Sequence, residues 1–198
     1  CEYRKTATQE GMEPMTDYKI HNENTAPISA AELLKKAKEK YGFIPNLLGT
    51  MAEAPALLKA YMTLGGIFDE TSFSPTEKQI VLLTVSAVNG CSYCMAAHSV
   101  IAEMQGVPED VIRSLRQSAT IKDTKLEALH RFSYIVAETR GQPSEEDITQ
   151  FLGAGYNKTQ VLEVVLGVGF KTLSNYTNHI AHTPLDEAFK KAEWKKTG

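Results

Sequence analysis

The stretch from Ser74 to Val88 most constrains the fold, because it joins a clear helix start to a helix that is apolar almost all round. Ser74 suits the N-cap, Pro75 suits the first helical position, and Glu77 stands third, where a carboxylate favours the helix start. The apolar residues that follow cover most of the circumference: Ile80, Val81, Leu82, Leu83, Val85, Ala87 and Val88. Such a helix is buried by its neighbours. We therefore expect it inside a helical domain.

Helical signals also dominate the rest of the chain. Further helices are expected at residues 30–41, 55–64, 91–105, 108–116, 122–140, 144–154 and 158–180, with an apolar segment at 47–51. Ser29 and Glu32 form a capping-box pattern at the start of the helix expected at 30–41. Gly65-Gly66 is expected to end the helix at 55–64. The valine-rich segments 80–88 and 161–168 lie in periodic stretches too long for strands. We therefore predict an all-α protein.

Composition is that of an ordinary globular protein of 198 residues, with 42% hydrophobic and 23% charged residues. We expect one domain over residues 25–198, preceded by a polar leader, residues 1–24, that is flexible or foreign to the natural chain. Cys1 lies in this leader and is expected to carry no function. Met15 could be the natural start.

Charge and hydropathy argue against two classes of partner. The formal net charge of −3 provides no basic field for nucleic acid, and the lysine-rich stretches are interpreted as solvated helix faces. No run approaches the roughly 20 apolar residues that a membrane span needs. We expect a cytoplasmic protein that binds neither nucleic acid nor membrane.

A faint internal repeat adds to the fold prediction. Residues 159–168 resemble the apolar helix at 76–88, and each segment is followed by a helical histidine, His179 or His98. In the second copy the cysteine positions fall on residues such as Thr172 and Asn175. If the repeat is real, only the first copy kept its thiols.

The richest chemistry lies in residues 90–98, which contain Cys91, Cys94 and His98. On a helix, Cys94 lies about 60° and His98 about 20° from Cys91, so all three share one face. A cysteine at a helix start faces the positive end of the dipole, and a nearby histidine can take its proton. A second thiol keeps oxidation reversible by forming a disulfide, which an external dithiol must then reduce. The segment is therefore interpreted as a redox centre.

Glu77 joins this centre only if the chain reverses. In one straight helix, Glu77 and Cys91 would be about 21 Å apart. If Asn89-Gly90 closes an antiparallel hairpin, residues equidistant from the turn meet, and Glu77 falls roughly opposite His98. A carboxylate there would orient the imidazole and raise its basicity.

Together, Glu77, Cys91, Cys94 and His98 on an all-α chain resemble the alkylhydroperoxidase D-like group of the carboxymuconolactone decarboxylase superfamily. Residues 41–46 and the helix start at 74–77 look like its peroxidase-related branch. The resemblance implies an AhpD-like helical fold, trimers or hexamers, and an enzyme that reduces organic hydroperoxides without a cofactor. Lipoyl-bearing or thioredoxin-like dithiols are the implied reductants.

The resemblance also implies roles for individual residues. The second cysteine of the family attacks the peroxide and the first resolves the product, which implies Cys94 and Cys91 respectively. The relay histidine and glutamate correspond to His98 and Glu77.

Two positions depart from the family pattern. Some well-known members have a histidine where this chain has Tyr93, and their relay glutamate lies where it has Gln79. The relay is therefore expected to be shortened or differently aligned here. Tyr93 is interpreted as a packing residue.

Other interpretations of the cysteine pair remain open. The pair could be half of a zinc site with His98, or two small core residues. A redox sensor or thiol-disulfide partner protein would keep both thiols but react slowly with peroxide. A decarboxylase gives the dithiol no role. His130, His179 and His182 are interpreted as surface or core histidines.

Overall fold

A computed structural model describes residues 17–196, and within this range every regular element is a helix. The elements are α1 (Ile28–Tyr41), α2 (Asn46–Met51), α3 (Pro55–Asp69), α4 (Pro75–Val88), α5 (Ser92–Met104), α6 (Glu109–Arg116), α7 (Thr124–Glu138), α8 (Glu145–Gly153), α9 (Lys158–Ala181) and the 3-10 helix η1 (Glu187–Ala192). The all-α prediction is confirmed. None of these helices combines the length and apolar character that a membrane span requires.

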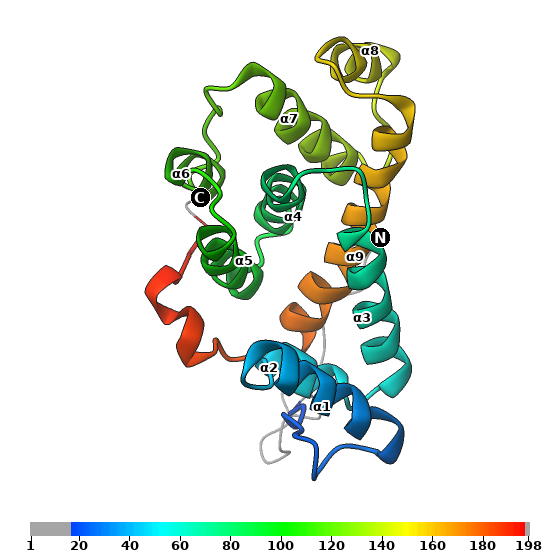
Figure 1. Ribbon diagram of the computed structural model, residues 1–198, viewed down its shortest axis with the longest axis vertical. Helices are drawn as coiled ribbons and strands as arrows, with labels where there is room; N and C mark the ends of the chain where they lie inside the picture. Colours follow the sequence, from blue (N-terminus) through cyan, green and yellow to red (C-terminus); the bar gives the residue numbers. More distant parts are fainter. Residues whose placement is uncertain (1–16, 197–198) are drawn as a thin grey trace, which may run out of the picture.

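Helix α4 begins and ends as its sequence predicts. Ser74 Oγ accepts from the Glu77 backbone, while the Glu77 carboxylate accepts from the Ser74 backbone at 2.8 Å, so the capping box is complete. Helix α4 crosses the middle of the bundle, with α5, α7 and α9 packed around it (Figure 1). Its apolar side chains are buried on nearly every side, as expected of a central helix.

Two helix boundaries differ from prediction. Helix α1 begins at Ile28 with Pro27 as its N-cap and no side-chain cap, so the predicted Ser29–Glu32 capping box is wrong. Helix α3 continues through Gly65-Gly66 to Asp69. A Cβ on Gly65 would lie 3.2 Å from the Phe170 ring, so this glycine lets α3 approach α9 closely instead of ending the helix.

Two apolar clusters fill the interior. The first surrounds α4 and includes Phe68, Ile80, Leu83, Leu129, Phe132 and Phe151. The second lies between α1, α2, α3, α5 and η1 and includes Leu34, Leu48, Met51, Leu58, Cys91 and Cys94. The thiol pair therefore belongs to the second cluster, at its border with the first.

The reversal between α4 and α5 follows the predicted turn. Gly90 has a positive φ of 68°, which a glycine adopts without strain. The Gly90 backbone N–H donates to Ala87 O at 3.0 Å, and that of Cys91 donates to Ser86 O at 2.9 Å. These two bonds form a Schellman motif that satisfies the last carbonyls of α4. The predicted hairpin is thus confirmed, and Cys91 becomes the N-cap residue of α5.

Helix α9 runs unbroken from Lys158 to Ala181, close to the predicted span. The segment expected to echo the α4–α5 hairpin therefore contains no second turn. The likeness between residues 76–88 and 159–168 is one of single helices.

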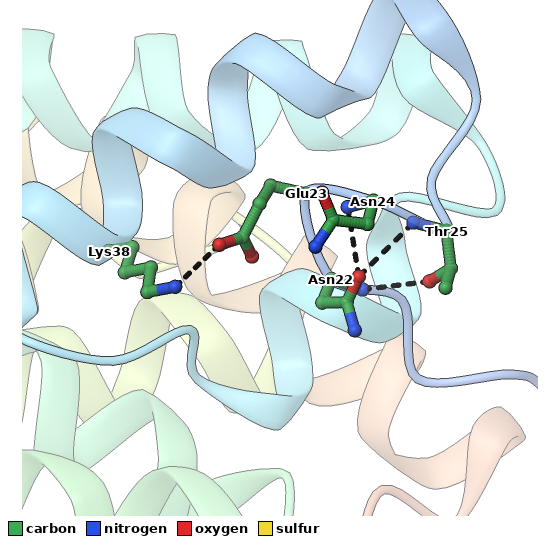
Figure 2. A network of polar contacts seen from close by, with 5 residues as sticks. All are labelled: Asn22, Glu23, Asn24, Thr25 and Lys38. Atoms are coloured by element: carbon green, nitrogen blue, oxygen red, sulfur yellow. Dashed lines mark hydrogen bonds and ion pairs between the residues drawn. The ribbon is translucent and has the colours of Figure 1, made fainter.

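Part of the predicted leader packs against the domain. His21 is buried, its backbone N–H donates to Gly49 O at 3.1 Å, and its Nε2 lies 2.7 Å from Glu53. The following turn is closed by Asn22 and Thr25, and Glu23 pairs with Lys38 of α1 (Figure 2). Residues 1–16, including Cys1, lie outside the described residues.

Gly167 lies where α9 meets α3 and α4, and we expect Gly167→Ala to destabilise the protein by about 1–3 kcal/mol. A Cβ at this position would lie 2.6 Å from Val81 and 2.9 Å from Phe68, too close without displacement of both side chains. Urea unfolding monitored by circular dichroism measures the change. Gly66→Ala is the matched control: it meets no atom within 4 Å and should stabilise α3 by up to about 1 kcal/mol. Equal stability of the two variants would contradict this packing account.

Candidate functional site

Cys91 and Cys94 lie together at the start of α5, as the hairpin requires. Both thiols are free and each residue is only 1% exposed. The Asn178 side-chain amide donates to both, at 3.6 Å to Cys91 Sγ and 3.3 Å to Cys94 Sγ. The two sulfur atoms therefore share one hydrogen-bond donor, the side-chain amide of a residue in α9.

Helix α9 presents a buried polar face to the thiols. Lys171, Ser174 and Asn175 are fully buried and Asn178 nearly so, at successive turns of the helix. The Cys94 thiol donates to Ser174 Oγ at 3.7 Å, one turn before Asn178. Contacts thus run in opposite order along α5 and α9, which brings Lys171 toward the end of the site that holds His98.

The pKa values of the two thiols are shifted in opposite directions. Burial by itself raises the pKa of the Cys94 thiol, but the hydrogen bond from Cys91 and the positive charge of Lys171 outweigh burial, and the pKa lies well below its usual value. Polar contacts from Ser174 and Asn175 act in the same direction. The pKa of Cys91 is raised, because this thiol donates to Cys94 and is buried. These directions make Cys94 the more acidic thiol of the pair.

His98 lies one turn beyond Cys94 and contacts α4. Its Nδ1 is 3.0 Å from Gln79 Oε1, and Gln79 Nε2 donates to Gln105 Oε1 at 3.0 Å. Because Gln79 uses its oxygen toward His98, this network assigns the imidazole proton to Nδ1 and leaves Nε2 basic. Burial, with the charge of Lys171, holds the pKa of His98 well below its usual value. The imidazole is therefore neutral.

Glu77 does not occupy the place opposite His98 that the sequence predicts; Gln79 does. The Glu77 carboxylate accepts from the Ser74 backbone, and on its other side it raises the pKa of Tyr156, a phenol already shifted upward by burial. Two residues along a helix correspond to about 200° of rotation, so Glu77 and Gln79 point in nearly opposite directions. The hairpin is right, but the pairing within it is displaced by two residues.

Tyr93 points away from the thiols. Its hydroxyl donates to Asp186 Oδ2 at 2.5 Å and accepts from the Leu47 backbone at 3.3 Å, and its ring packs edge-on against Phe189. Asp186 also accepts from the Asn46 backbone. Tyr93 therefore fastens α5 to α2 and to the segment before η1, in keeping with its predicted packing role.

The remaining candidate groups lie apart from this site. His130 pairs with Glu127 within α7, and His179 and His182 are exposed at the end of α9. Throughout residues 17–196, His, Cys, Asp and Glu side chains nowhere gather in threes as a metal site would require. A pocket of about 420 Å³ lies between α7 and α8, and another of about 540 Å³ between α6 and the C-terminal segment; neither is lined by the thiols.

Sequence reasoning missed most of the α9 contribution. The sequence predicts Asn175 only as a cysteine-equivalent position and assigns no role to Lys171, Ser174 or Asn178. A signal was present, because these four polar residues recur at positions i, i+3, i+4 and i+7 of a long helix. Such a stripe normally faces water, so nothing in the sequence marks it as buried.

The comparisons with known proteins agree with this architecture. Residues 55–131 match the carboxymuconolactone decarboxylase family. An uncharacterized peroxidase-related protein from Ralstonia eutropha JMP134, an alkylhydroperoxidase AhpD core, superposes with a TM-score of 0.78 at 20% identity, over 90% of this chain and 96% of that one. A peroxidase-related protein from Silicibacter sp. TM1040 gives 0.74 at 18% identity, over 92% and 97%. No curated protein matches the sequence.

A third similar structure is the debrominase Bmp8 in complex with 2,3,4-tribromopyrrole. Its TM-score is 0.75 at 16% identity, over 92% of this chain and 97% of that one. At such identities the structural likeness shows a shared fold and no shared reaction.

The pairing of His98 with Gln79 predicts how two similar substitutions differ. Gln79→Glu should raise the pKa of His98 by about 1–3 units, because a carboxylate at this distance favours the imidazolium. The matched change Glu77→Gln should leave that pKa within about 0.3 units, because the Glu77 carboxylate is engaged in the α4 cap. Imidazole NMR titration of each variant measures the shift. A His98 pKa that responds to Glu77→Gln and not to Gln79→Glu would reverse the assignment.

Proposed function

The chain belongs to the carboxymuconolactone decarboxylase superfamily through residues 55–131 and has the AhpD-like fold, and from this premise we propose that it is a thiol-dependent peroxidase acting on organic hydroperoxides. The observation that carries the proposal is the shared hydrogen bonding of Asn178 to two thiols of opposite acidity. A low-pKa thiol beside a neutral thiol is the arrangement that attack followed by resolution needs.

Cys94 is proposed as the attacking residue. Its thiolate sulfur attacks the terminal oxygen of the hydroperoxide, the O–O bond breaks, and Cys94 becomes a sulfenic acid while the substrate leaves as an alkoxide that takes up a proton. The sulfur is oxidised by two electrons and the peroxide is reduced by two. Burial of Cys94 favours this step, because a thiolate in a dry site is poorly solvated and therefore more reactive.

Cys91 is proposed as the resolving residue. Its thiol attacks the Cys94 sulfenic acid, a disulfide forms between them, and the sulfenic oxygen leaves as water. An external dithiol of lipoyl or thioredoxin type then reduces the disulfide and restores both thiols. Cys91 is the N-cap of α5: its φ and ψ are extended and only its carbonyl joins the helical hydrogen bonding, which lets its side chain move toward Cys94 with little disturbance of the helix.

His98 is proposed as the local proton acceptor, with Gln79 holding its orientation. Its Nε2 is the unprotonated nitrogen, and the lowered pKa keeps it so near neutral pH. Glu77 has no part in this relay as we propose it, because its carboxylate serves the helix cap.

The proposal competes with two other uses of the same dithiol. A redox-sensing or thiol-disulfide partner protein would form the disulfide but react slowly with peroxide. Reductive removal of halogen, the reaction class that the name of the debrominase Bmp8 implies for that protein, would also consume thiols. Both alternatives are distinguished by the substrate that oxidises Cys94.

Stopped-flow oxidation tests the peroxidase directly. We expect wild type to react with cumene hydroperoxide at least about 100-fold faster than free cysteine at pH 7. Cys91→Ser should form a Cys94 sulfenic acid at the wild-type rate, trapped by dimedone and found by mass spectrometry. Cys94→Ser should lose the fast phase.

Two results would overturn these assignments. If wild type reacts no faster than free cysteine, the proposed peroxidase activity is wrong. A normal sulfenic acid in Cys94→Ser, with none in Cys91→Ser, exchanges the two roles. A brominated pyrrole offered in place of the hydroperoxide serves as the control for dehalogenation.

Self-association is also proposed, through an apolar stripe on the outer face of α9. Leu162, Val165, Tyr176 and Ile180 are each more than half exposed, and on the helix they lie within about 60° of one another. This stripe lies opposite the buried polar face of the same helix. Exposed apolar side chains gathered on one helix face mark an interface, and we propose that a second copy of the chain covers this one.

Size-exclusion chromatography with light scattering tests this interface. Wild type at about 50 μM should be oligomeric, and Val165→Glu should reduce the mass toward that of a single chain, because a buried carboxylate at an apolar interface is strongly unfavourable. Lys36→Glu, an exposed change on α1, is the charge-changing control and should leave the mass unchanged. A wild type of single-chain mass would refute the assembly.

A further inference from the structure

Lys171 stands out among the buried groups. Its side chain is fully buried, and its ammonium has no hydrogen-bond partner among the described residues. The nitrogen lies 5.8 Å from the centre of the Phe170 ring, which provides at most a weak cation–π contact. A buried cation is strongly unfavourable unless an anion lies near it. The burial of Lys171 therefore points to a counter-charge nearby.

The groups that face Lys171 identify this counter-charge. Helix α5 contributes Cys91, Cys94 and His98, and the charge of Lys171 acts on all three. Helix α3 contributes Tyr61, whose pKa is raised by burial and then by the charge of Cys94. The helices packed on α9 contribute no buried carboxylate other than that of Glu77, which caps α4. Glu127 of α7 accepts from the Ile121 backbone, Glu138 of α7 and Asp69 of α3 are exposed, and α2 has no acidic residue.

We propose that Lys171 is the counter-ion of the Cys94 thiolate and the acid that protonates the alkoxide released from the hydroperoxide. The inference deepens the proposed peroxidase and rests on it. Its basis is geometric: Lys171 lies one turn before Ser174 on the α9 face that contacts Cys94, with an ammonium that no other group uses. His98 cannot supply this proton, because its imidazole is neutral and its one N–H is directed at Gln79.

The proton balance closes over one cycle. The Cys94 thiolate takes the terminal oxygen and becomes a sulfenic acid, and the departing alkoxide takes a proton from the Lys171 ammonium, giving an alcohol and a neutral amine. Cys91 then forms the disulfide and water is released, with no net proton change. The external dithiol returns two thiols, and the Cys94 proton passes to the Lys171 amine, directly or through His98, to restore the thiolate and ammonium.

Lys171→Met and Lys171→Arg, in the full chain, test the two parts of the role. Methionine fills a similar volume without charge; arginine keeps the charge but is a far poorer proton donor. Absorbance at 240 nm against pH, on a Cys91→Ser background, follows the Cys94 thiolate. We expect Lys171→Met to move this titration upward by about 1–3 pH units, since loss of a positive charge disfavours the anion. Lys171→Arg should keep it within about 0.5 units.

Rates at a pH where Cys94 is fully ionised isolate the acid. Both variants should then reduce tert-butyl hydroperoxide at least about 100-fold more slowly than wild type. Reaction with peracetic acid should change less than about threefold, because its leaving acetate needs no proton. A lysine that only maintained packing would slow both oxidants equally. Lys158→Met, an exposed change on α9, is the matched control.

Each outcome decides one part of the proposal. An unchanged Cys94 thiolate titration in Lys171→Met would overturn the proposed role of Lys171 as the counter-ion. Full activity of Lys171→Arg toward tert-butyl hydroperoxide overturns the acid. If wild type fails to reduce any hydroperoxide, the proposed peroxidase and the acid fail together, while the 240 nm titration still tests the counter-ion. Thermal unfolding of each variant separates these results from loss of fold.

Discussion

The packing of α5 against a polar face of α9 is the contact on which the site depends. Lys171, Ser174, Asn175 and Asn178 are buried in a helix whose opposite side exposes apolar residues, the reverse of an ordinary surface helix. Buried polar groups are costly unless they find partners: Ser174, Asn175 and Asn178 find them in the two thiols, Ser86 and Asn89, whereas the Lys171 ammonium has no hydrogen-bond partner among the described residues. The site chemistry and the stability of this helix contact therefore have the same source.

The two thiols differ because the chain treats their positions differently. Cys91 ends the Schellman turn and caps α5, whereas Cys94 lies within the first helical turn and faces Ser174 and Asn178. The neighbours of Cys94 stabilise negative charge, and Cys91 itself donates to it. Two residues that look alike in sequence thus acquire distinct acidities from their place at one helix start.

Much of the fold was readable from local signals. The capped start of α4, its apolar circumference and the Asn89-Gly90 turn predicted a buried helix and a hairpin, because each depends on neighbours along the chain. The predicted helix end at Gly65-Gly66 was wrong, because a glycine in a helix can allow close packing as well as end the helix. Only the contact with Phe170 in the folded protein distinguishes these two roles. The predicted N-cap at Ser29 was also wrong, because the N-cap of α1 is Pro27.

The sequence by itself determined the all-helical class, the hairpin, and the grouping of Cys91, Cys94 and His98 on one helical face, because helical periodicity needs no partner. The tertiary structure decided which α4 residue contacts His98. That residue is Gln79, because Glu77 lies about 200° from Gln79 around the helix and its carboxylate forms the N-terminal cap. It also decided that Lys171 and Asn178 belong to the site. Whether a polar stripe faces water or another helix depends on packing between segments distant in the chain, which no local pattern records.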